Sequence, residues 1–143
     1  MSASDAVPPP NRLYRVAAVS GALLATFLLL GASGHFAAIW SRLVGPEAAS
    51  MDRFALILPG AVLLLSGFAN LATLYGLWRS GRTSLILALA VNVAAAGYFT
   101  YLLTRGVPDH PIGSFLAFAA GHTVVLASLC AGLRWPATAP DGA

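Results

Sequence analysis

Charged side chains are scarce in this chain, and long parts of it have none. Only 9% of its 143 residues are Asp, Glu, Lys or Arg, whereas 58% are hydrophobic. Four segments contain no charged residue at all: residues 16–40, 54–78, 83–104 and 112–133. Each is long enough to cross a hydrocarbon layer of about 30 Å, which takes roughly 20 helical residues. The sequence therefore predicts an all-α, polytopic membrane protein with four transmembrane helices.

Other absences narrow the function. The chain has no lysine, which excludes a retinal Schiff base, and the apolar segments lack the carboxylates that proton pumps and antiporters use. Its single cysteine, Cys130, cannot form a disulfide within the chain. No HExxH, Walker, CxxC or nucleophile motif is present. We assign no catalytic residue, no metal site and no particular cofactor, and these absences favour a non-catalytic protein.

The apolar segments take up most of the chain, so we expect one membrane domain over residues 12–135. The ends, residues 1–11 and 136–143, are rich in proline and alanine and are expected to be disordered tails. Only residues 79–82 join the second and third segments, which requires an antiparallel hairpin. The other connections are also short, and this favours an antiparallel, up-down four-helix bundle.

The arginines indicate how the bundle crosses the membrane. All eight basic residues are arginine, a bias that we attribute to the codon usage of a GC-rich bacterium. The side that carries both termini has five of them: Arg12, Arg15, Arg79, Arg82 and Arg134. The other side has three, offset by acidic residues: Arg42, Arg53 and Arg105 with Glu47, Asp52 and Asp109. We expect the protein in the inner membrane, and the positive-inside rule then predicts that both termini lie in the cytoplasm. Arginines that flank membrane spans give no reason to expect nucleic acid binding.

A cleaved signal peptide is the alternative interpretation of the first segment. Arg12 and Arg15 precede it, and the small residues 31–34 resemble a cleavage region. However, the apolar stretch continues to Trp40, which is too long for an ordinary signal peptide. A transmembrane helix is therefore the preferred interpretation.

Small residues at helical spacing predict the faces on which the helices pack. Helices in lipid associate through close backbone contact, because lipid tails are as apolar as leucine. The first segment has such a stripe: Ala18, Gly21, Ala25 and Ala32. We expect this stripe to face the other helices.

Each apolar segment also contributes one polar side chain at a similar depth. Measured from the cytoplasmic ends of the predicted segments at about 1.5 Å per residue, the depths are roughly 15, 12, 14 and 17 Å, for Thr26, Asn70, Asn92 and His122 respectively. Polar groups in hydrocarbon need partners, so these side chains should face inward and meet. Two interpretations stay open: a hydrogen-bonded clasp between helices, or a binding site for a lipophilic ligand.

A second polar group is predicted near the outer interface, and it consists of Ser33, His35, Tyr98 and Tyr101. His35 differs in depth from His122 by about 12 Å or more, which is too far for both to ligate one haem iron. The Asp109–His110 pair in the outer connection is expected to form a rigid turn into the last helix.

Three functions remain in order of preference. The first is an accessory or assembly subunit of a larger inner-membrane complex, or a self-associating bundle, whose partners are other membrane polypeptides or itself. The second is an intramembrane binding module for a quinone, haem, pigment or other lipophile, lined by Thr26, Asn70, Asn92 and His122. The third is an oligomeric transporter for a small solute.

Overall fold

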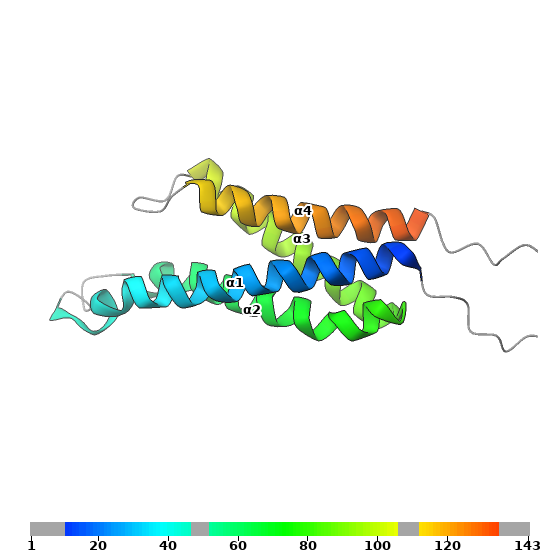
Figure 1. Ribbon diagram of the computed structural model, residues 1–143. Helices are drawn as coiled ribbons and strands as arrows, with labels where there is room; N and C mark the ends of the chain where they lie inside the picture. The colour runs from blue at the N-terminus through cyan, green and yellow to red at the C-terminus, as the bar shows by residue number, and fades with distance from the viewer. Residues whose placement is uncertain (1–10, 47–51, 106–111, 135–143) are drawn as a thin grey trace, which may run out of the picture.

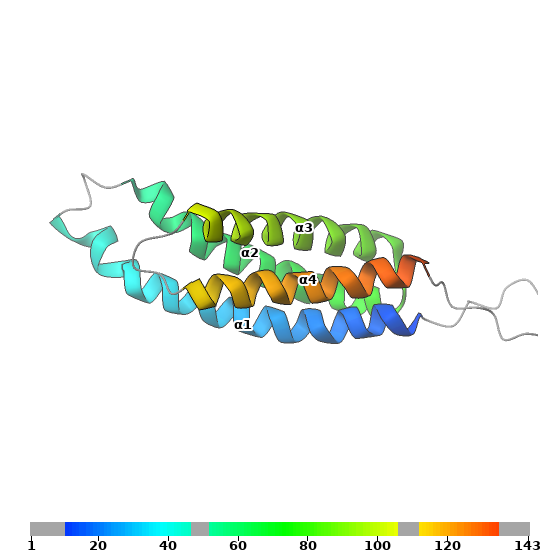
Figure 2. The same ribbon diagram turned by 90° about the horizontal axis from the view of Figure 1, so that it is seen from above.

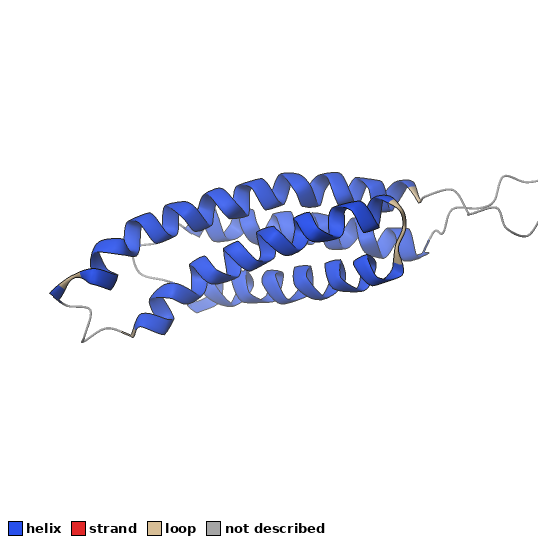
Figure 3. Ribbon diagram, turned by 90° about the horizontal axis from the view of Figure 1, so that it is seen from below, coloured by secondary structure: helices blue, strands red, loops and turns tan. Residues whose placement is uncertain are grey.

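The computed structural model describes residues 11–46, 52–105 and 112–134. These residues form four α-helices: α1 (Arg12–Val44), α2 (Arg53–Trp78), α3 (Arg82–Arg105) and α4 (Ile112–Arg134). All four are long and apolar enough to cross a membrane, and the described residues include no strand (Figure 3). The prediction of an all-helical chain with four candidate membrane spans is confirmed.

Capping residues set where the first two helices begin. Asn11 accepts a hydrogen bond from the Leu13 amide at 2.9 Å, so α1 starts at Arg12, about one turn before the predicted segment. Asp52 accepts from the amides of Phe54 and Ala55 at 3.0 and 3.2 Å and caps α2. Asn11 was predicted to be the last residue of a disordered tail, but it is buried. The other residues of the two predicted tails, 1–10 and 136–143, lie outside the described residues, as do Asp109 and His110.

A tight turn joins α2 to α3. Ser80 adopts a left-handed backbone conformation with φ 57°. Its amide donates to the Leu77 carbonyl at 3.0 Å, and the Gly81 amide donates to the Gly76 carbonyl at 2.7 Å. These two bonds are the Schellman arrangement that ends many helices. The left-handed residue is usually glycine, but here the Ser80 hydroxyl accepts from the Asn11 amide at 3.1 Å, which ties the turn to the start of α1.

The four helices lie lengthwise beside one another, and each packs against two others (Figures 1 and 2). The contacting pairs are α1–α2, α2–α3, α3–α4 and α1–α4, which closes a ring. The start of α1 and the end of α4 lie at the same end, where the Asn11 side chain donates to the Gly132 carbonyl at 2.9 Å. The α2–α3 turn lies at this end too, as its bond to Asn11 requires.

Glycines let α1 and α4 approach closely. The Tyr14 ring of α1 lies where a side chain at Gly132 would be. A methyl group added at Gly121 would come within 2.7 Å of Leu24. Farther along, α1 provides the glycine: a methyl group at Gly31 would come within 2.8 Å of the Phe118 ring. Large side chains therefore enter spaces left by glycines along this seam.

The same device brings α1 and α2 together. The predicted small-residue stripe of α1 is buried throughout: Ala18, Gly21, Ala25 and Ala32. On α2, a methyl group at Gly67 would lie 2.9 Å from Leu29 and 3.4 Å from the Ala25 carbonyl. Gly60 is similarly covered by His35 and Phe36. The predicted packing face of the first helix is confirmed.

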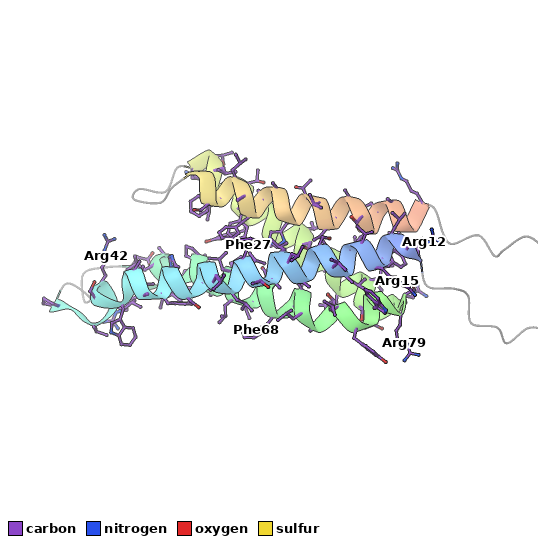
Figure 4. The ribbon with its side chains drawn as sticks, viewed as in Figure 1. Arg12, Arg15, Phe27, Arg42, Phe68 and Arg79 are labelled. Carbon is purple, nitrogen blue, oxygen red and sulfur yellow. The ribbon has the colours of Figure 1, made fainter. Side chains whose placement is uncertain are left out.

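The outer surface of the bundle is apolar, as contact with lipid requires. Phe27 of α1 and Phe68 of α2 are 65% and 56% exposed and project from the ribbon near mid-length (Figure 4). A surface this rich in exposed large apolar side chains is atypical of a water-soluble monomer. The labelled arginines Arg12, Arg15 and Arg79 lie at one end of the bundle and Arg42 at the other.

The seam between α1 and α2 predicts a matched pair of glycine substitutions. Gly67→Leu should lower the free energy of unfolding by about 1–3 kcal/mol, because Leu29 and the α1 backbone leave no room. Gly97→Leu makes the same change where nothing lies within 4 Å, and it should cost far less. Unfolding in mixed micelles, followed by circular dichroism, measures both. Equal losses would show that α1 and α2 are not closely packed at Gly67.

Candidate functional site

Buried hydrogen bonds cross the bundle near its middle. Asn70 of α2, Asn92 of α3 and His122 of α4 have exposed fractions of 3%, 0% and 0%. Asn92 Nδ2 donates to Asn70 Oδ1 at 3.0 Å, and Asn92 Oδ1 lies 2.8 Å from His122 Nδ1. The structure thus brings together three of the four side chains predicted for the midplane, and they join three helices.

Backbone carbonyls determine which way each amide points. A carbonyl oxygen only accepts hydrogen bonds, so the Asn70 atom lying 2.8 Å from the Ser66 oxygen is the amide nitrogen. The Ala88 oxygen, also at 2.8 Å, identifies the amide nitrogen of Asn92 in the same way. Asn92 therefore turns its oxygen toward His122, and the Nδ1 atom of His122 carries the proton and donates.

This leaves a lone pair on the other ring nitrogen of His122. In the neutral ring one nitrogen is a donor and the other an acceptor, so Nε2 is the acceptor. His122 Nε2 is buried and has no hydrogen-bond partner among the described residues. A buried polar atom without a partner costs about 1–3 kcal/mol, so the network is not fully satisfied as a structural clasp.

Thr26 does not join the network. It lies on the exposed side of α1, and its hydroxyl donates to the Ala22 carbonyl at 3.1 Å. The α1 residue beside the network is Gly21, where a methyl group would come within 3.3 Å of Asn70 Oδ1. The fourth member of this layer is therefore a glycine that makes room for the Asn70 amide.

Aromatic rings surround the imidazole of His122. The Phe99 ring stacks on it with a centroid distance of 5.8 Å and an interplanar angle of 15°. Phe99 also contacts Phe115 and Phe118, with centroid distances of 6.4 and 5.3 Å. The polar network thus supports an aromatic cluster on the side of the bundle away from the termini.

A cavity of about 390 Å³ lies next to this cluster. Its walls come from all four helices and are mostly apolar or aromatic, with two basic side chains, His35 and Arg42. The apolar and aromatic lining includes Ile39, Pro59, Leu63, Phe99, Phe115 and Phe118. None of the four residues predicted to line a ligand site, Thr26, Asn70, Asn92 and His122, is among its lining residues.

His35 forms one wall of the cavity and links α1 to α2. Its Nε2 atom lies 2.8 Å from the Leu56 carbonyl, so this nitrogen is protonated and donates. Pro59 lies three residues farther along and has no amide hydrogen, so the preceding turn lacks one of its usual bonds. The His35 bond holds the α2 backbone at this weakened turn.

The other residues of the predicted outer cluster have separate environments. Ser33 is exposed and its hydroxyl donates to the Leu29 carbonyl at 2.9 Å. Tyr98 is half-buried with its ring against the edge of Phe99, at a centroid distance of 5.6 Å. Tyr101 is exposed, with the Arg105 guanidinium 5.6 Å from its ring centre. Only His35 of this group lines the cavity.

The cavity was not predicted, although the sequence contains a signal for it. His35, Ile39 and Arg42 follow one another at spacings of four and three residues, which places them on one face of a helix. Phe99 and Phe115 gave no comparable signal, because phenylalanine is common on both lipid-facing and buried positions of membrane helices. Within residues 11–46, 52–105 and 112–134, no three His, Cys, Asp or Glu side chains gather as a metal site.

In comparisons with known proteins, no family model, no curated protein and no solved structure matches the chain. The site is therefore interpreted from its own chemistry.

The hydrogen bonds of Asn92 predict a measurable coupling with His122. Asn92→Leu should destabilise the bundle by about 1–3 kcal/mol, because it leaves Asn70 Oδ1 and His122 Nδ1 buried without partners. A double-mutant cycle with His122→Leu should give a coupling of about 0.6 kcal/mol, and at most about 1.7 kcal/mol. Thr26→Val, a change at an exposed site, is the control and should be nearly neutral. A coupling of zero would contradict the proposed bond.

The two described histidines should have opposite tautomers. We expect the proton on Nδ1 in His122 and, in neutral His35, on Nε2, as their oxygen partners require. Nitrogen-15 NMR of the histidine-labelled protein in micelles distinguishes these forms, and His110→Gln removes the third signal. Signals are assigned with His35→Gln. A proton on Nε2 of neutral His122 would contradict the assigned amide orientations.

Proposed function

We propose that this multi-pass membrane protein binds a lipophilic ligand with a polar or anionic head group in the cavity between α1 and the other helices. The observation that supports this most directly is the cavity itself, with apolar walls and two basic side chains. Ligand sites are typically concave and apolar with a few polar groups that fix the orientation. The protein is a binding module in this proposal, and it catalyses no reaction.

The two basic residues define the kind of head group. Arg42 is exposed and lines the cavity, and no carboxylate among the described residues pairs with it. Its guanidinium can bind a carboxylate or phosphate through two parallel hydrogen bonds. His35 lines the same cavity and adds a polar imidazole that its bond to the Leu56 carbonyl holds in place. A fatty acid, an isoprenoid phosphate or a quinone with its carbonyl groups would satisfy this arrangement, with its apolar part along Leu63 and Phe115.

We further propose an antiparallel bundle in a bacterial inner membrane with both termini in the cytoplasm. The balance of arginines supports this orientation, with five at the end that carries the termini and three at the other. In this orientation the cavity lies in the outer half of the membrane. Its ligand would enter from the outer leaflet.

The accessory or self-associating subunit is a competing proposal. It is supported by the apolar surface on all four helices, but contact with lipid accounts for the same surface. The oligomeric transporter has no observation of its own in support. The two leading proposals differ in what is recovered with the protein: a small molecule at fixed ratio, or another polypeptide.

Partly filling the cavity should weaken ligand binding. A methyl group added at Gly34, which lines the cavity, meets nothing within 4 Å, so Gly34→Leu should fit without disturbing the helix. A leucine there takes up part of the cavity, and we expect the bound small molecule to fall by about tenfold or more. Native mass spectrometry of protein from its own membrane in mild detergent measures this. Gly97→Leu, at a surface site with equal space, is the matched control.

The head group is tested separately with Arg42→Gln, which removes the cation and leaves the apolar walls of the cavity unchanged. We expect weaker retention of the same small molecule, whereas Arg105→Gln, an equal charge change on α3, should retain it. If the wild-type protein carries no small molecule but migrates with other polypeptides at fixed ratio, the ligand-binding proposal is wrong and the accessory role is supported.

A further inference from the structure

A second apolar depression lies on the lipid-facing surface of the bundle, between α1 and α2. It is at the end of the bundle that carries the termini. It consists of two adjoining hollows of about 300 and 340 Å³ that share Val19, Leu23 and Trp78. We call it the α1–α2 groove, and its lining is Arg15, Val16, Ala18, Val19, Ser20, Ala22, Leu23, Thr26, Leu74 and Trp78. Thr26, which does not reach the buried network, is part of this groove.

Two arginines lie against aromatic rings at the end of the bundle that carries the termini. The Arg15 guanidinium lies 5.3 Å from the Trp78 ring centre, so Trp78 is both a wall of the groove and a platform for the cation. Arg79 directly follows Trp78 as the residue that caps the end of α2; its guanidinium lies 5.6 Å from the Tyr75 ring centre and donates to the Tyr75 hydroxyl at 2.7 Å. Figure 4 shows both arginines at this end of the bundle.

No carboxylate among the described residues balances this charge. The one described acidic residue is Asp52, which caps α2 at the opposite end. Each guanidinium has five donors, and Arg79 uses one on Tyr75. Arg15, a lining residue of the groove, and Arg79, which directly follows the lining residue Trp78, therefore both keep donors for an anion at the end of an apolar groove that runs toward the middle of the bundle.

We propose that the α1–α2 groove binds one anionic phospholipid, with its phosphate on Arg15 and Arg79 and an acyl chain along Leu23 and Thr26. Tryptophan, tyrosine and arginine are the side chains that occupy the head-group level of a membrane, and basic sites between helices select anionic lipids. The groove supplies the complementary surface for the chain. A phosphatidylcholine shares the phosphate, but its choline cation would be repelled by the same arginines.

This inference is independent of the proposed function. The groove and the cavity share no lining residue, and they lie at opposite ends of the bundle. The lipid site also does not require that the end with the termini be cytoplasmic. Either proposal can therefore fail while the other stands.

The test is native mass spectrometry of the full chain in detergent micelles titrated with phosphatidylglycerol or phosphatidylcholine. Wild-type protein should retain one phosphatidylglycerol in preference to phosphatidylcholine. Arg15→Gln/Arg79→Gln should weaken this binding by about thirtyfold, or about fivefold for each arginine. Arg82→Gln/Arg134→Gln is the matched control, because it removes the same charge at the same end from α3 and α4.

A third variant tests the groove without changing any charge. Thr26→Phe places a large ring in the groove from an exposed position, so the fold should persist and phosphatidylglycerol binding should fall. Circular dichroism checks the helical content of each variant. Equal binding of both lipids would overturn the proposal. So would a loss of phosphatidylglycerol binding in the Arg82/Arg134 control equal to that in the Arg15/Arg79 variant, because it would leave only a general attraction between arginines and anionic lipid. A dimer in place of a lipid adduct would overturn it in favour of a second copy of the chain.

Discussion

The arrangement of the bundle depends on the hydrogen bonds that the side-chain amide of Asn92 makes with two other helices. Lipid tails provide no hydrophobic force that drives helices together, so their rotation must be fixed by polar bonds and close packing. Asn92 bonds to Asn70 of α2 and His122 of α4 while its nitrogen also bonds to its own helix at Ala88. Rotating any of these three helices would leave buried polar atoms without partners. The α1 helix has no polar partner in this layer and fits through Gly21 instead.

Once these rotations are fixed, the sizes of side chains decide where the helices touch and where they leave space. Along the α1–α4 seam, Tyr14, Leu24 and Phe118 each occupy the space beside a glycine on the facing helix. Beyond Gly31 this alternation stops, because Gly34 is not met by a large side chain from another helix. The cavity lies here, and its α1 wall extends from Gly31 to Arg42. It is thus a consequence of the packing pattern, and the Phe99 ring, stacked on His122, connects its wall to the polar network.

The sequence was sufficient to predict the four helices and the meeting of Asn70, Asn92 and His122, because charge-free length and depth can both be counted along a chain. It misplaced Thr26 for a physical reason. The depth was counted from the first apolar residue, Val16, whereas the Asn11 cap starts α1 at Arg12, about 6 Å earlier. Depth also says nothing about which face of a helix a residue occupies. The cavity was harder still to predict from the sequence, because an empty volume depends on the positions of side chains from four helices at once.

The position of the network also bears on the choice between the proposed binding role and transport. It lies between the cavity and the end of the bundle with the termini, because Phe99, a wall of the cavity, stacks on His122. Fully buried apolar side chains, among them Leu28, Val125 and Leu129, fill the bundle interior on either side of it. A solute crossing the bundle would have to separate Asn92 from both of its partners, in a medium where each unpaired polar group is costly. The cavity is therefore closed toward the termini by the bonds that hold the helices in register. A pocket of this kind can hold a ligand without letting it cross, which favours binding over transport.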